Sequence, residues 1–401
     1  MSKVDLMYDQ TIPYSLLVRP YTEPPNTDGS ELMVLVNIPQ DSFMLQLPIR
    51  GTGMEINWGD GNVNTYTQTS APTRFNLIQH TYSQKGLYWI RMKNLIQISW
   101  GSDTYFSVHD GVGITSNERN SYIKFHQWGS SNNWLTTDLT PFRFQGLTNL
   151  EFDAVDIPQN ISSIKRLTMA FDMTSFNQDI SNWNVSSVTR MDYLFRLTPF
   201  NQPLNNWNVS SVTNMHIMFG STPFNQPLNN WNVSSVTNMQ SMFSNSSFNQ
   251  DISGWNTANV TNMQTMFSNS SFNQDISGWN ISKVKTLAGM FFISSFNQDL
   301  SALDISNVTS ILGMFEFSNY NQPLNWNTSN ITNMSRVFKG TPFNQDISGW
   351  DTSNVTEMRR MFQDNEVFNQ NLSGWNVSNV TSYLNFDTNT PAWTLPKPNF
   401  I

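Results

Sequence analysis

Large apolar side chains recur through the second half of the chain with a period of 24 residues, apart from one interval of 23 and one of 25. One ladder is an aromatic residue directly before an Asn-Gln pair: Phe176, Phe200, Phe224, Phe248, Phe272, Phe296, Tyr320, Phe343 and Phe368. A second ladder is Trp183, Trp207, Trp231, Trp255, Trp279, Leu303, Trp326, Trp350 and Trp375. A third is Phe171, Phe195, Phe219, Phe243, Phe267, Phe291, Phe315, Phe338 and Phe362. A fixed period of this length is typical of units that stack in a row.

One unit, residues 252–274, shows which elements this pattern predicts. Residues 252–257 predict a short strand in which Trp255 and Thr257 face the same side. The following apolar residues recur at i, i+3, i+6 and i+7, which predicts a short helix or 3₁₀ segment; they are Val260, Met263, Met266 and Phe267. The predicted fold class is a repeat solenoid, leucine-rich-repeat-like, built of short parallel strands plus short helices. One unit alone buries too little apolar surface to offset its ordering, so neighbours must cover its flanks.

The chain before the repeats has a period-two pattern. Residues 32–36, 43–47 and 54–58 predict short strands, and Gly59–Asn62 predicts a hairpin turn, so a small β-sandwich should precede the solenoid. The predicted domains follow from these patterns: 1–30, an extended arm rich in proline; 31–100, the β-sandwich; 101–170, a connector and N-terminal cap; 171–384, the solenoid; and 385–401, a C-terminal cap.

Composition excludes several classes of function. The 401 residues contain no cysteine, which excludes disulfide scaffolds, cysteine-based metal sites and thiol catalysis. A net charge of -8 argues against binding to nucleic acid, which needs clustered positive charge. The first ten residues do not resemble a signal peptide, and no apolar run is long enough for membrane insertion.

Candidate catalytic groups are few. The four histidines, His80, His109, His126 and His216, show neither metal-ligand spacing nor a nucleophile–histidine–carboxylate arrangement. We therefore expect no enzyme activity, no cofactor and no metal site.

One row of carboxylates follows the Asn-Gln pairs: Asp179, Asp251, Asp275, Asp299 and Asp346. Stacking would bring neighbouring members close enough to chelate calcium or to act as an acid and base. Pro203, Pro227 and Pro323 occupy the same place in other units, which favours a solvated turn.

A stripe of polar residues is the candidate binding site. The residue after each Trp should point away from the core; these residues are Asn184, Asn208, Asn232, Asn256, Asn280, Asp304, Asn327, Asp351 and Asn376. On a concave sheet they would offer hydrogen bonds to a peptide, a glycan or a neighbouring subunit. An internal asparagine ladder is the equally weighted alternative. Positions that vary between units should carry specificity: Arg190, Asp192, His216, Ile217, Lys283, Lys285, Arg336, Arg359 and Arg360.

Two stretches resemble known families. The block F-N-Q-D-I-S-G-W-N-x-x-N-V-T-N-M-x-x-M-F, nearly whole at Phe248–Phe267 and Phe272–Phe291, resembles the BspA-like leucine-rich-repeat surface proteins. That resemblance implies adhesive or protein-binding roles on bacterial surfaces or virus particles. The order W-G-D-G, H-x-Y, G-x-Y, starting at Trp58, resembles a PKD-like domain, which implies a spacer or weak binder.

The leading hypothesis is a non-catalytic recognition and structural protein, displayed on a virion or cell surface and binding protein or glycan through the solenoid. Its partners would be other proteins, glycans or neighbouring subunits of a particle. One alternative is a polysaccharide-acting solenoid enzyme, which needs two carboxyls about 5–10 Å apart in one groove. The other alternative is a cytoplasmic protein-interaction scaffold.

Overall fold

The computed structural model describes residues 24–25, 28–47, 49–69, 77–99, 122–130, 132, 142–154, 156–158 and 161–400. Most of the predicted arm 1–30, much of the predicted connector 101–170 and His109 lie outside these residues. The chain divides into two compact units. One comprises Met1–Trp134 with Asn149–Gln159, and the other comprises Leu135–Thr148 with Asn160–Ile401.

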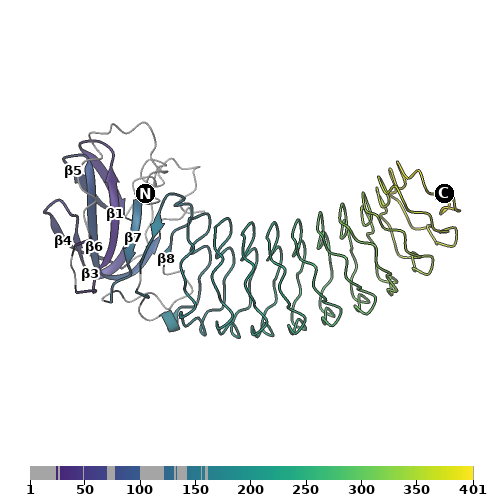
Figure 1. Cartoon of the computed structure of the whole chain (residues 1–401), viewed down its shortest axis with the longest axis horizontal. Coiled ribbons are helices and arrows are strands. Elements are labelled where there is room, and N and C mark those ends of the chain that lie inside the picture. Colours follow the sequence, from purple (N-terminus) through teal and green to yellow (C-terminus); the bar gives the residue numbers. More distant parts are fainter. Residues whose placement is uncertain are drawn as a thin grey trace, which may run out of the picture. The chain divides into compact units, whose positions relative to one another are not determined.

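The first unit is built on a curled mixed sheet with strand order β4-β3-β6-β1-β7-β9 (Figure 1). The strands are β1 Leu32–Ile38, β3 Ile49–Asn57, β4 Val63–Gln68, β6 Gly86–Ser99, β7 Tyr122–Gln127 and β9 Glu151–Phe152. A separate antiparallel pair joins β2 Phe43–Leu47 to β5 Ile78–Tyr82. The sheet is antiparallel except at β7–β9, which is parallel.

The predicted small β-sandwich is wrong, although its strands lie where the pattern placed them. β1 is buried along nearly its whole length and pairs with β6 on one edge and β7 on the other. A strand that pairs along both edges lies in the interior of a sheet, so β6, β1 and β7 belong to one sheet. β7 and β9, which complete that sheet, come from well beyond the segment that carries the period-two pattern, and local alternation contains no signal for such distant pairing.

The W-G-D-G segment forms the predicted turn and is closed by side chains. Trp58 is fully buried, its Nε1 donates to Asn64 Oδ1 at 3.0 Å, and its carbonyl accepts the Tyr82 hydroxyl at 3.0 Å. Asp60 Oδ2 lies 2.7 Å from His80 Nε2, and the His80 ring stacks on Trp58. Gly59 has φ +83, and a Cβ there would lie 2.7 Å from the Trp89 carbonyl oxygen. Asp60 and His80 therefore have structural roles.

The second unit begins with the short strand β8 Phe142–Arg143 and the 3₁₀ helix η4 Ile161–Ser163, and continues as a row of coils (Figure 1). Alternate backbone N–H groups of one coil donate to carbonyls of the next. In one coil the donors are Met215, Ile217, Phe219 and Ser221, and the acceptors are residues 238, 240, 242 and 244, at 2.8–3.0 Å. Single parallel bridges mark the same register, from Arg166↔Arg190 to Glu357↔Ser382.

The predicted fold class, a leucine-rich-repeat-like solenoid of short parallel strands plus short helices, is wrong. The segment expected to be helical consists of consecutive turns, closed by Met266 N–H to Met263 C=O and Ser268 N–H to Thr265 C=O. Thr265 and Asn269 have φ of 53° and 50°, a left-handed conformation that no right-handed helix contains. The N–H of Thr265 donates to Ala288 in the next coil, so it is not available to a helix. Among the described residues, η4 is the only helix.

Residues 252–257, which were expected to form a strand, also contain a turn, because the Trp255 N–H donates to the Ile252 carbonyl at 3.1 Å. The side-chain prediction is nevertheless confirmed, since Trp255 and Thr257 are both buried. Turns that close every three residues bury the same positions as a short helix does. The apolar spacing alone therefore does not distinguish the two backbones.

The core of the coils is a set of stacked rings. Every member of the two phenylalanine ladders is fully buried, and the tryptophans are 3–6% exposed. Within one coil Phe267 stacks on Phe272 at 3.9 Å, and between coils it lies 5.8 Å from Phe243 and 5.9 Å from Phe291. Offset stacking of this kind adds to the free energy gained from burial.

The row of coils bends because its two sides have different spacings. On the hydrogen-bonded side the backbones approach as in a sheet, at roughly 4.8 Å. Across the core the rings lie progressively further apart: Phe195–Phe219 at 5.8 Å, Phe200–Phe224 at 6.1 Å and Trp255–Trp279 at 6.4 Å. The hydrogen-bonded turns therefore line the inside of the bend, and Figure 1 shows the coil edges closer together along one side. We call the outward-facing side chains of these turns the concave face, and the opposite side the tryptophan side.

Candidate functional site

The concave face is where the coils differ from one another. Its outward-facing positions lie two, three, six and seven residues after each bridge residue, together with the bridge residues themselves, and they range from exposed, as at Arg359, to buried, as at Asp192. At the first of these positions successive coils carry Asp192, His216, Gln240, Gln264, Ala288, Leu312, Ser335 and Arg359. The buried column three residues further on is phenylalanine in every one of these coils. Of the positions predicted to carry specificity, all but Lys283 and Lys285 belong to this face.

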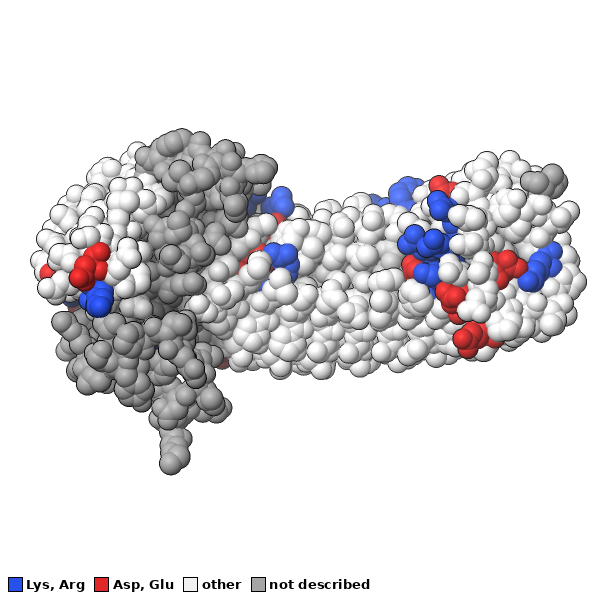
Figure 2. Space-filling view, turned by 90° about the horizontal axis from the view of Figure 1, so that it is seen from above, with Lys and Arg blue, Asp and Glu red and all other residues white. Residues whose placement is uncertain are grey.

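The charged residues of the concave face gather near the two ends of the row. Figure 2 shows these two groups, with an uncharged stretch between them. Between Arg196 and Lys283 the chain contains only two charged residues, Asp251 and Asp275, and both belong to the row of turn aspartates.

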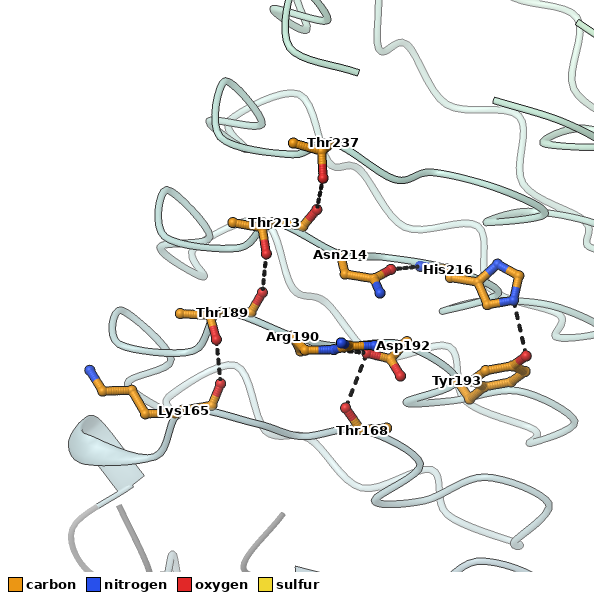
Figure 3. Close-up of polar contacts among 10 residues, drawn as sticks. All are labelled: Lys165, Thr168, Thr189, Arg190, Asp192, Tyr193, Thr213, Asn214, His216 and Thr237. Carbon is orange, nitrogen blue, oxygen red and sulfur yellow. Dashed lines mark hydrogen bonds and ion pairs between the residues drawn. The ribbon is translucent and has the colours of Figure 1, made fainter. Parts of the chain in front are cut away.

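In the first group, the carboxylates of Asp172 and Asp192 are each paired with an arginine. Asp172 is fully buried; it accepts from Arg196 Nε at 2.7 Å and Nη2 at 2.9 Å, and from Gln145 Nε2 at 2.7 Å. These bonds raise the pKa of Arg196. Asp192 is likewise held by Arg190 Nε at 2.9 Å and Thr168 Oγ1 at 3.1 Å (Figure 3). The bidentate pair at Asp172 and the two single bonds at Asp192 stabilise the first coils and leave neither carboxylate free for a ligand.

Both ring nitrogens of His216 bond to neighbouring coils. Its Nδ1 lies 3.0 Å from the Gln240 carbonyl, which can only accept, so this nitrogen carries the proton. Its Nε2 then accepts from the Tyr193 hydroxyl at 3.0 Å (Figure 3). Burial lowers the pKa of His216. With both ring nitrogens engaged, His216 serves as a bridge between coils.

The second group surrounds a hollow of about 480 Å³ in the concave face. Small residues form its floor, because Ala288, Gly289 and Gly313 stand where other coils carry glutamine, isoleucine or threonine. Both glycines have φ near +60°, a backbone conformation that side chains rarely adopt. Sequence reasoning missed these floor residues. Their signal was the loss of side-chain volume at two neighbouring columns of the aligned repeats.

The rim of the hollow is basic. Arg336, Arg359 and Arg360 line it together with Glu316 and Glu357. Glu316 is neutralised by Lys339 Nζ at 3.0 Å, and Glu357 accepts from the neutral amide of Asn333 at 3.0 Å. None of the three arginines has an ion pair within the coils, all of which the structure describes from residue 161 to 400. Three positive charges against the single charge of Glu357 leave a surplus of two.

The predicted asparagine stripe lies on the tryptophan side, and all nine residues are exposed. In each of them an Oδ1 atom accepts the backbone N–H two residues later, as in Asn232 to Ser234 at 3.1 Å and Asp351 to Ser353 at 2.9 Å. The same bond forms at Asn184, Asn208, Asn256, Asn280, Asp304, Asn327 and Asn376. These are Asx turns within one coil, so the stripe is not an internal ladder. Ligand binding by this stripe stays a prediction.

The internal asparagine ladder is formed instead by the Asn-Gln pairs. Asn249 Oδ1 accepts the backbone N–H of Asn273 at 2.9 Å and the side-chain amide of Gln274 at 3.0 Å. The same contact repeats from Asn177 to Asn369. Tryptophan Nε1 atoms bond to the preceding coil as well, as in Trp255 to the Leu228 carbonyl at 3.1 Å.

The row of turn aspartates forms Asx turns of the same kind. Asp251 accepts the Ser253 N–H at 2.9 Å, and such bonds lower the pKa of Asp179, Asp251, Asp299 and Asp346. Asp275 makes the same bond to Ser277. No group of three metal-ligating side chains occurs in the part of the chain that the structure describes. His126, in the first unit, pairs with Asp153 at 2.9 Å.

The stacked coils define a repeat protein with a constant scaffold and a variable concave face. Residues 141–247, 220–325 and 316–394 each match the family described as Mycoplasma protein of unknown function, DUF285. The chain therefore belongs to this family. No curated protein and no solved structure matches the chain. The match does not reach residues 1–140, so the PKD-like resemblance stays a prediction. Among the described residues, no helix has the length and apolar character needed to cross a membrane.

Proposed function

We propose that the protein is a non-catalytic recognition protein, displayed on a cell surface or virus particle, which binds another macromolecule through the concave face. The observation that carries the proposal is the distribution of sequence differences between coils. Contacts that hold the coils together repeat almost without change, whereas the outward side chains of the concave face differ from coil to coil. Repeat proteins bind ligands on extended concave surfaces of this kind.

Surface display is supported by the resemblance of the repeat block to BspA-like surface proteins. Exposure of intact cells or particles to protease tests it. Display predicts cleavage without lysis, whereas the cytoplasmic scaffold predicts protection until lysis.

A polysaccharide-acting enzyme is the second candidate, and the carboxylates argue against it. A general acid needs a raised pKa, whereas hydrogen bonds lower the pKa of Asp251 and Asp299. Glu316 is held in an ion pair by Lys339. Release of reducing ends from polysaccharides by the purified protein, lost in Glu357→Gln, would support the enzyme and contradict our proposal.

Photo-crosslinking compares the two sides of the row directly. A benzoylphenylalanine replaces Gln240 or Arg336 on the concave face, and Asn232 or Asn256 on the tryptophan side as matched controls, in the cells or particles that carry the protein. Adducts with another macromolecule from the concave positions only are the expected result. Equal adducts from both sides, or adducts from the tryptophan side alone, would contradict the proposal.

A further inference from the structure

The hollow lined by residues between 264 and 360 combines small floor residues, basic side chains and apolar side chains. In the first group on the concave face Arg190 and Arg196 are paired with Asp192 and Asp172. At the hollow, Arg336 and Arg360 occupy the same column of neighbouring coils, since the Arg336 N–H donates to the Arg359 carbonyl. Like charges in adjacent positions repel one another. The surplus of positive charge at this hollow contrasts with the net charge of -8 of the whole chain.

Two residues that line the hollow each have a buried polar atom without a hydrogen-bond partner. Ser335 lines the hollow and is 4% exposed, and its buried Oγ makes no hydrogen bond. The Nε of Arg360 is buried without a hydrogen bond as well. A buried polar atom without a partner costs about 1–3 kcal/mol, so these two residues are not placed by hydrogen bonds that stabilise the coils. Both atoms are donors, and the guanidinium groups present further donors in the fork that fits a carboxylate.

The same face is also apolar. Leu312 and Phe292 line the hollow, and Ile293 and Phe317 in the same two coils are 45% and 44% exposed. The lining residues come from five successive coils, which span about 19 Å at the backbone spacing of roughly 4.8 Å. That is the length of about six residues of extended chain.

We infer that this hollow binds an acidic peptide segment of a partner protein. Carboxylates of the peptide lie against Arg336, Arg359 and Arg360, and its apolar side chains lie against Leu312 and Phe317. The apolar surface beside the arginines favours a peptide over an acidic glycan. This inference rests on the proposed function and assigns its partner class.

A random peptide library selected on the immobilised full-length protein tests this inference. Peptides bound by the wild type should be enriched in Asp and Glu together with apolar residues, and the selected peptides should weaken at least about tenfold between 50 and 500 mM salt. The triple variant R336Q/R359Q/R360Q should lose this enrichment and bind the selected peptides at least about tenfold more weakly. The matched control is the triple variant K165Q/K283Q/K285Q, which removes three positive charges outside the hollow and should bind the selected peptides like the wild type.

A second variant blocks the hollow without changing charge. Ala288→Gln introduces the residue that stands at the same place as Gln240 and Gln264, so the coil backbone accepts it. It should abolish binding of the selected peptides, while Gln240→Ala leaves binding intact. Unchanged unfolding midpoints show that each variant is folded.

Selection without acidic enrichment, or equal enrichment by the triple variant, would overturn the inference. So would tetragalacturonate that binds the hollow more tightly than the selected peptides, since the ligand class would then be an acidic glycan. Either outcome leaves the crosslinking result for the concave face standing, so failure here is distinguishable from failure of the proposed function.

Discussion

The two sides of the row of coils are held together by different chemical groups. On the tryptophan side and at the Asn-Gln pairs, side chains make the bonds between coils, as in Trp255 Nε1 to the Leu228 carbonyl and Asn249 Oδ1 to the Asn273 N–H. On the concave face the bonds that repeat in every coil join backbone to backbone, as in Phe219 N–H to the Met242 carbonyl, and side-chain bonds such as Arg196 to Asp172 occur only at individual coils. A side chain that makes a structural bond cannot vary without cost, whereas a backbone bond leaves its side chain free to vary. The fold therefore separates a constant scaffold from a variable surface.

The largest expected effect comes from removing one ring of the scaffold. Phe267→Ala should lower the free energy of unfolding by about 3–5 kcal/mol, because the ring is fully buried between its neighbours. Guanidinium unfolding followed by tryptophan fluorescence measures the loss. Phe317→Ala makes the same change on the concave face, where the ring is 44% exposed, and should cost about 1 kcal/mol or less. Equal costs at the two positions would contradict the separation of scaffold from surface.

A smaller effect distinguishes the internal asparagine ladder from the exposed asparagine stripe. Asn249→Ala leaves the Asn273 N–H without its acceptor and should cost about 1–2 kcal/mol in thermal or guanidinium unfolding. Asn256→Ala removes only the Asx bond to Ala258 within one exposed turn and should cost about 0.5 kcal/mol. The reverse order would mean that the stripe holds the coils together.

The sequence predicted some features of the coils and missed others. The period and the buried rings could be predicted because each coil repeats the same apolar positions. The turns could not, since residues such as Ile217 and Thr265 adopt a left-handed conformation that their own preference disfavours. Backbone hydrogen bonds between coils impose this left-handed conformation. The concave face could be recognised only in part: Arg336, Arg359 and Arg360 were identified as variable, but the bend follows from ring spacings that no local pattern encodes.

A substitution that relieves backbone strain on the concave face should stabilise the protein. Ile293 has φ +53 although it is β-branched and 45% exposed. Asn245 and Asn269 occupy the same place in two earlier coils, and asparagine tolerates this conformation better. Ile293→Asn should therefore raise the free energy of unfolding by about 0.5–1 kcal/mol. A lowered melting temperature would show that the exposed isoleucine packs against the scaffold.

The smallest effect is a pH dependence at His216. Burial lowers its pKa below the unfolded value of 6.5, so the unfolded chain takes up a proton that the folded chain does not. The stability that depends on neutral His216 is present above pH 6.5 and declines as the pH falls below that value. His216→Gln, which copies Gln240, should lose less stability than the wild type when the melting temperature is measured at pH 7.5 and pH 5.0. Parallel losses would contradict the lowered pKa of His216.

The claim that scaffold and surface are independent is tested most directly by making the surface uniform. In the three coils around the hollow, the residues two, three, six and seven places after the bridge residue are replaced by those of the coil at 238–246, which are Gln240, Ser241, Ser244 and Asn245. We predict that the variant still unfolds cooperatively, with a guanidinium midpoint shifted by no more than the single changes such as Ile293→Asn and Phe317→Ala produce, and that crosslinks formed from the hollow disappear. A cooperative loss of folding, or crosslinks that survive the replacement, would contradict the account.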